Sequence, residues 1–107
     1  MGLFSRMKRT TAGEVTERLA ARKVVVVDVR QPAEWRRGHI QGSLNVPLAR
    51  VSRGLPRVPA NTTIVTVCAS GHRSAAAART LSRAGYDVEN LEGGIRAWSK
   101  AGLPLSR

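Results

Sequence analysis

Two short runs of apolar, mostly β-branched residues constrain the fold more than any other feature of this chain. Residues 23–29 read KVVVVDV and residues 62–67 read TTIVTV. A strand with one face in water would alternate apolar and polar residues, and neither run follows that alternation. The runs therefore predict strands buried on both faces, which is typical of a parallel sheet covered by helices.

Helical segments are expected between these strands. Thr11 and Glu14 fit a capping box that opens a short helix running to Ala21. Pro32 suits the first turn of a second short helix, which Gly38 would end. Two further helices are expected at residues 74–84, before Gly85, and at residues 95–101, before Gly102.

The alternation of strands and helices predicts the fold class. Further strands are expected at residues 86–91 and, between two turns, within residues 38–48, and a loop is expected where Gly54, Pro56 and Pro59 occur. These segments predict one α/β domain over residues 1–107, with a central, mainly parallel sheet flanked by helices. Residues 1–10 are expected to be a flexible N-terminal segment.

Composition narrows the function classes. The single cysteine cannot form a disulfide within the chain, and the longest apolar run is too short to span a membrane, so we expect a soluble cytoplasmic protein. The net charge is +11, from 18 basic and 7 acidic residues. Because the arginines are scattered and aromatic residues are few, a solvated basic surface is favoured over a nucleic-acid-binding one. That surface would attract small anions.

The only cysteine, Cys68, comes where the 62–67 strand ends and the next helix begins. In parallel α/β sheets, ligands gather at the carboxyl ends of the strands. A backbone that wraps around the thiol would aim N–H groups and the helix N-terminus at the sulfur, which favours the thiolate. Gly71 permits a conformation that a β-carbon would resist, and Ser74 is expected to be the N-cap. A small buried core cysteine is the alternative, but the polar and flexible residues that follow favour a functional thiol.

Three segments of the chain, in order, resemble the single-domain rhodaneses, a family of sulfurtransferases. They are residues 24–48 (VVVVDVRQPAEWRRGHIQGSLNVPL), 67–81 (VCASGHRSAAAARTL) and 85–105 (GYDVENLEGGIRAWSKAGLPL). The resemblance implies the three-layer rhodanese fold and an enzyme that transfers sulfur from thiosulfate to cyanide or a thiol. No cofactor is expected, and no metal either, because the two histidines and one cysteine lack the spacing of a ligand set.

The same resemblance implies roles for the cysteine loop. The Cys68 thiolate would take the outer sulfur of an anionic donor such as thiosulfate, release sulfite and hold the sulfur as a persulfide. A thiol, a protein thiol or cyanide would then remove it, because the chain has no second cysteine to do so. Arg73 would meet the sulfonate of the donor, and His72 either shares this role or faces solvent. The residues expected to bind substrate are Ala69, Ser70, Gly71, His72, Arg73 and Ser74.

Other polar residues are expected to support the structure. Asp28, Arg30 and Glu34 fit a set of ion pairs that ties the first buried strand to the following helix, although Asp28 as a general base is the alternative. His39 is expected to stabilise a turn by a hydrogen bond and not to bind a metal. We also expect Trp35 and Trp98 to be core anchors, and Gly93 and Gly94 to let the backbone pass near the loop or to start the last helix.

Two other functions fit parts of this pattern. Cysteine-loop phosphatases and arsenate reductases resemble C-x5-R, whereas here Arg73 comes one residue earlier and would leave a smaller cradle. A non-catalytic rhodanese-like interaction module is the second alternative. Inactive members typically lack the cysteine, and this chain keeps it, so the enzyme is favoured.

Overall fold

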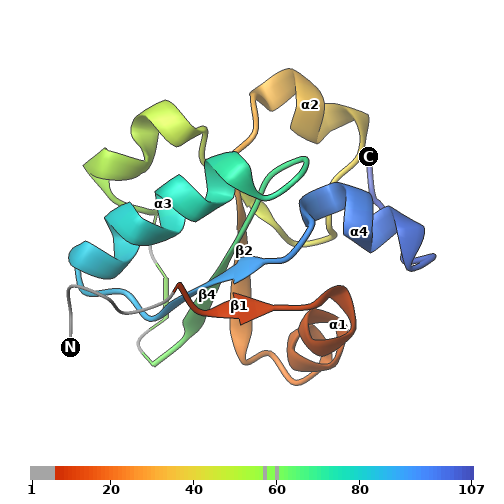
Figure 1. Cartoon of the computed structure of the whole chain (residues 1–107), viewed down its shortest axis with the longest axis horizontal. Helices are drawn as coiled ribbons and strands as arrows, with labels where there is room; N and C mark the ends of the chain where they lie inside the picture. Colours follow the sequence, from red (N-terminus) through yellow and green to blue (C-terminus); the bar gives the residue numbers. More distant parts are fainter. Residues whose placement is uncertain (1–6, 57, 60) are drawn as a thin grey trace.

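The centre of the fold is a parallel sheet of five strands. The computed structural model describes residues 7–56, 58–59 and 61–107. The strands are ordered β1-β5-β4-β2-β3 across the sheet, and all the paired neighbours run parallel (Figure 1). Their bounds are Arg9–Thr10 (β1), Val24–Asp28 (β2), Leu44–Asn45 (β3), Thr63–Val67 (β4) and Val88–Leu91 (β5). The predicted α/β class with a parallel central sheet is confirmed.

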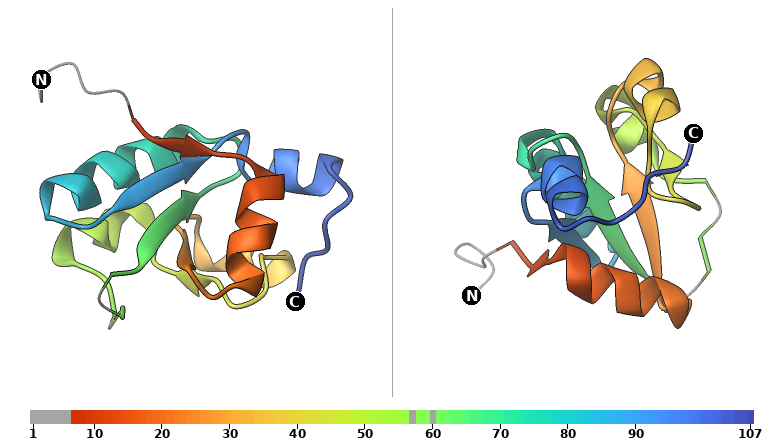
Figure 2. Two further views of the ribbon diagram at one scale, coloured as in Figure 1. Left: turned by 90° about the horizontal axis from the view of Figure 1, so that it is seen from below. Right: turned by 90° about the vertical axis from the view of Figure 1, so that its right-hand side faces the viewer.

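Helices cover both faces of this sheet, which gives three layers (Figures 1 and 2). Buried side chains of α1 and α4 form one apolar cluster with the sheet, and those of α3 and η2 form the other. The short helix α2 buries none of its residues fully and follows β2. The helical bounds are Ala12–Ala20 (α1), Pro32–Arg37 (α2), Leu48–Arg53 (the 3-10 helix η2), His72–Arg83 (α3) and Gly94–Lys100 (α4).

The apolar runs are buried because their side chains alternate between the two layers. In β2, Val24 and Val26 join the cluster beneath α1 and α4, whereas Val27 joins the cluster beneath α3. The same alternation along β4 places Ile64 on the α3 face and Val67 on the opposite face. The next residue, Cys68, therefore turns its side chain toward the α3 face.

Several local predictions are confirmed. The capping box of α1 is formed: the Glu14 amide donates to Thr11 Oγ1 at 3.3 Å, and the Thr11 amide donates to Glu14 Oε1 at 2.9 Å. Pro32 is the first residue of α2. Gly85 and Gly102 follow α3 and α4 with φ of 100° and 79°, the left-handed conformation that ends a helix without penalty for glycine.

Two local predictions are wrong, and one helix was not expected. The 3-10 helix η2 precedes Gly54, while Gly54, Pro56 and Pro59 lie in a loop as predicted. Helix α3 begins at His72, two residues before the expected start, because Gly71 is the N-cap with φ of 110°. Part of the expected flexible segment is ordered, since Arg9 pairs with Asn90 of β5; residues 1–6 lie outside the described residues. No helix in the described ranges has the length and apolar character needed to cross a membrane.

Candidate active site

Cys68 lies at the carboxyl end of β4, beneath the loop that leads into α3. The residue is only 1% exposed and contacts the apolar cluster of the α3 layer, so it is more buried than the sequence suggested. Its sulfur is nevertheless not left among hydrocarbon alone. The Gly71 amide donates to Cys68 Sγ at 3.0 Å, and the Ser74 hydroxyl donates to it at 3.3 Å.

These donors determine the protonation of the thiol. Burial raises the pKa of Cys68, but the Ser74 hydroxyl and the amides of Ser74, Gly71 and Ser70 outweigh burial, so the pKa lies below its ordinary value. Ser74 was expected to cap α3 with its hydroxyl. Because the helix starts earlier, Ser74 lies in its first turn, fully buried, and its hydroxyl points to the sulfur instead.

The loop is fixed by the start of the last helix. The Ile95 amide donates to the carbonyl oxygen of Cys68 at 2.8 Å, and the Arg96 amide donates to that of Ala69 at 3.1 Å. A β-carbon on Gly94 would overlap the carbonyl oxygens of Cys68 and Ala69. The expectation that this glycine pair lets the backbone pass near the loop and starts the last helix is therefore confirmed.

Asn90 of β5 is a supporting residue that sequence reasoning missed. Its side-chain amide donates to the carbonyl oxygen of Gly71 at 3.2 Å, and its Oδ1 accepts from Thr66 Oγ1 at 3.2 Å. The residue is 8% exposed, so it is a buried polar group whose hydrogen bonds are satisfied. The sequence signal that could have indicated this role is an amide side chain near the carboxyl end of the expected 86–91 strand.

Arg73 lies beside the thiol and is paired with Glu34 of α2. Its Nη1 and Nη2 donate to the two carboxylate oxygens of Glu34 at 2.8 and 3.0 Å. The hydrogen bond from Arg73 lowers the pKa of Glu34 to about 2. Glu34 and, more weakly, the thiolate of Cys68 raise the pKa of Arg73. The ion pair joins α2 to the cysteine loop.

The expected set of Asp28, Arg30 and Glu34 is therefore only partly correct. Arg30 donates to Asp28 through Nε and Nη2, the shortest contact being 2.8 Å, and it also donates to the carbonyl oxygen of Gly38 at 2.7 Å. Both partners are buried, at 0% and 6% exposure. Through these contacts the pair ties the end of β2 to Gly38, the residue that follows α2. Glu34 is outside the set because it pairs with Arg73.

His72 lies on the outer side of the loop. It is exposed, and its Nδ1 is 3.4 Å from Ser70 Oγ. It lines a cavity of about 420 Å³ together with residues of the loop, α3, β1 and β5, among them Ser70, Gly71, Arg79, Arg9 and Asn90. Cys68 does not line this cavity, which lies between the loop, α3, β1 and β5.

The remaining predicted residues have structural contacts. His39 Nδ1 is 2.8 Å from the carbonyl oxygen of Trp35, and the two rings stack with centroids 3.6 Å apart, so the predicted turn-stabilising contact is confirmed. Trp98 is 4% exposed and is a core anchor as expected. Trp35 is not, because it is only half-buried and its Nε1 donates to Ser43 Oγ at 3.0 Å.

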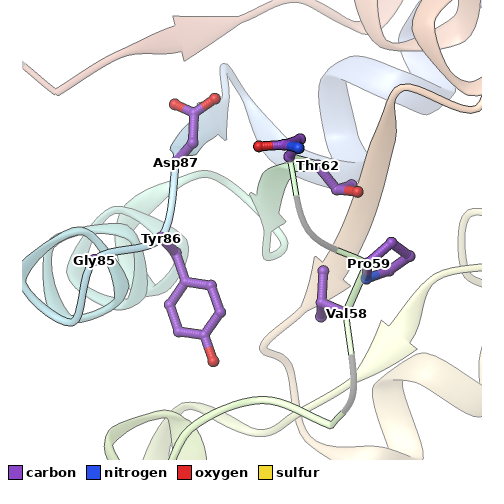
Figure 3. A pocket seen from close by; sticks show the side chains of 7 residues that line it. Val58, Pro59, Thr62, Gly85, Tyr86 and Asp87 are labelled. Atoms are coloured by element: carbon purple, nitrogen blue, oxygen red, sulfur yellow. The ribbon is translucent and has the colours of Figure 1, made fainter.

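A second cavity, of about 510 Å³, is distant from the thiol. It lies at the amino ends of β4 and β5, where Tyr86 and Asp87 face Val58, Pro59 and Thr62 (Figure 3). The loop of Cys68 is at the opposite, carboxyl ends of these strands. This cavity therefore has no part in the chemistry of the cysteine.

The fold and the site define an α/β protein with a cysteine loop at the carboxyl end of a parallel sheet. The Rhodanese-like domain family matches residues 11–101. A sulfurtransferase of Allochromatium vinosum is 39% identical over 93 residues, which cover 85% of this chain and 87% of that protein. A rhodanese-related protein of Thermoplasma volcanium has a TM-score of 0.84 and 31% identity, over 92% of this chain and 97% of that one.

A longer relative matches as well. The probable adenylyltransferase/sulfurtransferase MoeZ of Mycobacterium tuberculosis is 39% identical over 88 residues, which cover 79% of this chain. The chain spans only 22% of the length of MoeZ. The chain belongs to the rhodanese-like domain family, whose members among these relatives include proteins named sulfurtransferases.

The Ser74 hydroxyl is expected to lower the pKa of the thiol. In Ser74→Ala the thiolate loses a donor, so its pKa rises and alkylation by iodoacetamide at pH 7 slows about tenfold, since a hydrogen bond to a charged group contributes ~1.5–3 kcal/mol. The measurement is the thiolate absorbance and the alkylation rate across pH. The control is Ser70→Ala, which removes a hydroxyl from the same loop and keeps the amides. Equal profiles for Ser74→Ala and the parent chain would contradict this role.

Gly94 is expected to be irreplaceable for steric reasons. Gly94→Ala and Gly102→Ala both force alanine into a left-handed conformation, at φ of 60° and 79°, but only Gly94 has neighbouring atoms in the way. The free energy of unfolding of Gly94→Ala should fall below that of Gly102→Ala by about 1–3 kcal/mol, a typical cost of overpacking. Urea denaturation measures both variants. Equal losses would mean that conformation alone, and not the close approach to the loop, requires this glycine.

Proposed function

We propose that this chain is a thiosulfate sulfurtransferase that carries sulfur as a persulfide on Cys68. The observation that carries the proposal is the pair of hydrogen bonds from Gly71 and Ser74 to Cys68 Sγ, with the lowered pKa of the thiol. A thiolate at neutral pH is the nucleophile that sulfur transfer requires. Relatives named sulfurtransferases support the same reaction class.

In the first half-reaction, the Cys68 thiolate attacks the outer sulfur of thiosulfate. A bond forms between the two sulfur atoms, the sulfur–sulfur bond of thiosulfate breaks, and sulfite leaves with the electron pair. The outer sulfur then bears the negative charge as a persulfide anion. The loop amides that hold the thiolate are preorganised donors for this charge.

In the second half-reaction, an acceptor takes the outer sulfur. Cyanide attacks it, the persulfide bond breaks, thiocyanate leaves and Cys68 returns to the thiolate. A thiol acceptor leaves as a persulfide in the same way. Because Cys68 is the only cysteine of the chain, the acceptor comes from outside, and the kinetics are ping-pong. A reducing compartment such as the cytoplasm suits a lone thiol of this kind.

Arg73 is proposed to bind the sulfonate end of the donor. A guanidinium has five N–H donors, and the contacts to Glu34 use one on each terminal nitrogen, so three remain. Glu34 fixes the orientation of Arg73 without exhausting its hydrogen bonds. The positive charge beside the thiolate suits a dianionic donor such as thiosulfate.

The loop supports this function over the two alternatives. Phosphatase-like loops place the arginine one position later, where this chain has Ser74, and here Ser74 donates to the sulfur itself. A loop one residue shorter suits a sulfur atom better than a tetrahedral phosphate. A non-catalytic module would have no use for a thiol with a lowered pKa.

The persulfide is tested directly by mass. Treatment of the intact chain with thiosulfate should add about 32 Da, one sulfur atom, which dithiothreitol removes. Cys68→Ser should gain no mass and lose thiosulfate:cyanide activity while its circular dichroism and unfolding midpoint stay close to those of the parent. Turnover of p-nitrophenyl phosphate without any gain of mass would point to the phosphatase alternative, and absence of both reactions would point to the non-catalytic module.

The donor role of Arg73 separates the two half-reactions. Arg73→Ala should slow persulfide formation from thiosulfate by about 10- to 100-fold, since hydrogen bonds to charged groups contribute ~1.5–3 kcal/mol. Discharge of the preformed persulfide by cyanide should change much less. Stopped-flow measurement of each half-reaction decides, with Arg83→Ala at the far end of α3 as the control. Equal losses in both half-reactions would show that Arg73 shapes the loop and does not bind the donor.

A further inference from the structure

Three exposed arginines surround the cysteine loop without a carboxylate partner among the described residues. They are Arg37 of α2, Arg79 of α3 and Arg96 of α4. Within the described part of the chain, every ion pair uses other basic side chains. We call these three residues the arginine collar.

Each member of the collar is placed near the loop by a different observation. Arg37 is one helical turn after Glu34, so it lies on the face of α2 that meets Arg73. The Arg96 amide donates to the carbonyl oxygen of Ala69 in the loop at 3.1 Å. Arg79 lines the cavity of about 420 Å³ whose other walls include Ser70, Gly71 and His72. The collar therefore approaches the loop from three helices.

The carboxylates described near the loop have basic partners outside the collar. Glu34 pairs with Arg73, and Glu92, which lines the same cavity as Arg79, is 3.9 Å from Arg9. Neither of these two carboxylates forms an ion pair with a collar arginine. The loop is therefore surrounded by uncompensated positive charge, which favours a negatively charged partner and speeds its approach.

The partner is more consistent with a protein than with a single-stranded nucleic acid. Binding of single-stranded nucleic acid uses exposed aromatic side chains on which bases stack. Among the described residues, Trp98 is buried and Trp35 stacks on His39, while Tyr86 lies by the second cavity at the other end of the sheet. The collar thus supplies charge without a stacking surface.

Burial of the thiol limits how the partner presents its acceptor. Cys68 is 1% exposed, so a thiol set in a rigid surface would be kept away by the residues that cover it. We infer that the physiological acceptor is an acidic protein that presents a cysteine, flanked by aspartate and glutamate, on a flexible segment recognised by the arginine collar. This inference rests on the proposed function for its sulfur-transfer step, but the binding step does not.

The transfer experiment uses the full chain loaded with sulfur on Cys68. The probes are a short peptide whose one cysteine is flanked by aspartate and glutamate, and its amide counterpart with asparagine and glutamine. The double variant Arg37→Gln/Arg96→Gln is compared with Lys23→Gln/Arg83→Gln, which removes the same charge from the opposite end of the sheet. Flanking carboxylates also change the pKa and reactivity of the peptide thiol. The readout is therefore the ratio of rates between protein variants for the same peptide.

The collar variant should discharge to the acidic peptide about 3- to 10-fold more slowly than the parent, as expected for the loss of two exposed charge contacts. It should react normally with the amide peptide and with 2-mercaptoethanol, and added salt should remove the difference. The control variant should resemble the parent. Equal effects of the two double variants, or equal effects on both peptides, would overturn the inference.

Binding is measured separately, by fluorescence anisotropy of a labelled acidic peptide with serine in place of cysteine. This assay needs no sulfur on Cys68, so it tests the collar even if thiosulfate loads nothing and the proposed function fails. Weaker binding to the collar variant alone supports the inference. Tighter binding of a labelled single-stranded RNA of matched charge, lost in the same variant, would overturn it in favour of a nucleic acid.

Discussion

The sulfur of Cys68 is stabilised by donors that exist only because the backbone turns sharply at Gly71. With φ of 110°, Gly71 brings its own amide to 3.0 Å from the sulfur and starts α3 immediately afterwards. That early start makes Ser74 a first-turn residue whose hydroxyl also reaches the sulfur. Burial acts in the opposite direction, because it favours the neutral thiol. The geometry of one glycine therefore decides which of two opposed effects is larger.

This turn is held in place by its surroundings. Helix α4 approaches so closely that only glycine fits at position 94, and its first amides bind the carbonyl oxygens of Cys68 and Ala69. On the other side, Glu34 binds Arg73 with both oxygens. The loop is thus connected to three helices and, through Asn90, to β5. Such fixed donors would need no reorganisation as charge moves along the proposed persulfide.

The Glu34–Arg73 pair also has a defined dependence on pH. The pKa of Glu34 is lowered to about 2, so the pair stabilises the fold fully above the ordinary carboxyl pKa of 4.5 and less as pH falls toward 2. The side chains are 29% and 37% exposed, so solvent screening makes the contribution of this pair to stability modest. Its main effect near neutral pH is to orient Arg73.

The layers of the fold could be predicted from the sequence because burial on both faces leaves a readable pattern. The valines of β2 and the glycines that follow α3 and α4 act through local geometry, and the structure agrees with them. The partner of Glu34 could not be predicted, because Arg73 is distant along the chain and Arg30 is near. The role of Ser74 was missed for a related reason: its cap preference is local, whereas its contact with the sulfur depends on where Gly71 starts the helix.

The buried thiol and the basic surface solve two different problems in the proposed reaction. A partner protein cannot be recognised at the sulfur itself, because Cys68 is 1% exposed. The Gly71 amide and the Ser74 hydroxyl beside it already donate hydrogen bonds to the sulfur. Selectivity for a large partner must then come from residues around the loop. The arginine collar, which has no carboxylate partner among the described residues, lies there. Arg73, which is nearest the sulfur, is restrained by Glu34 and suits the small donor. In the proposed reaction, Arg73 is the inner cation, and its ion pair with Glu34 fixes it for the small donor. The collar arginines are the outer cations, and the acceptor's carboxylates would supply the partners that they lack among the described residues.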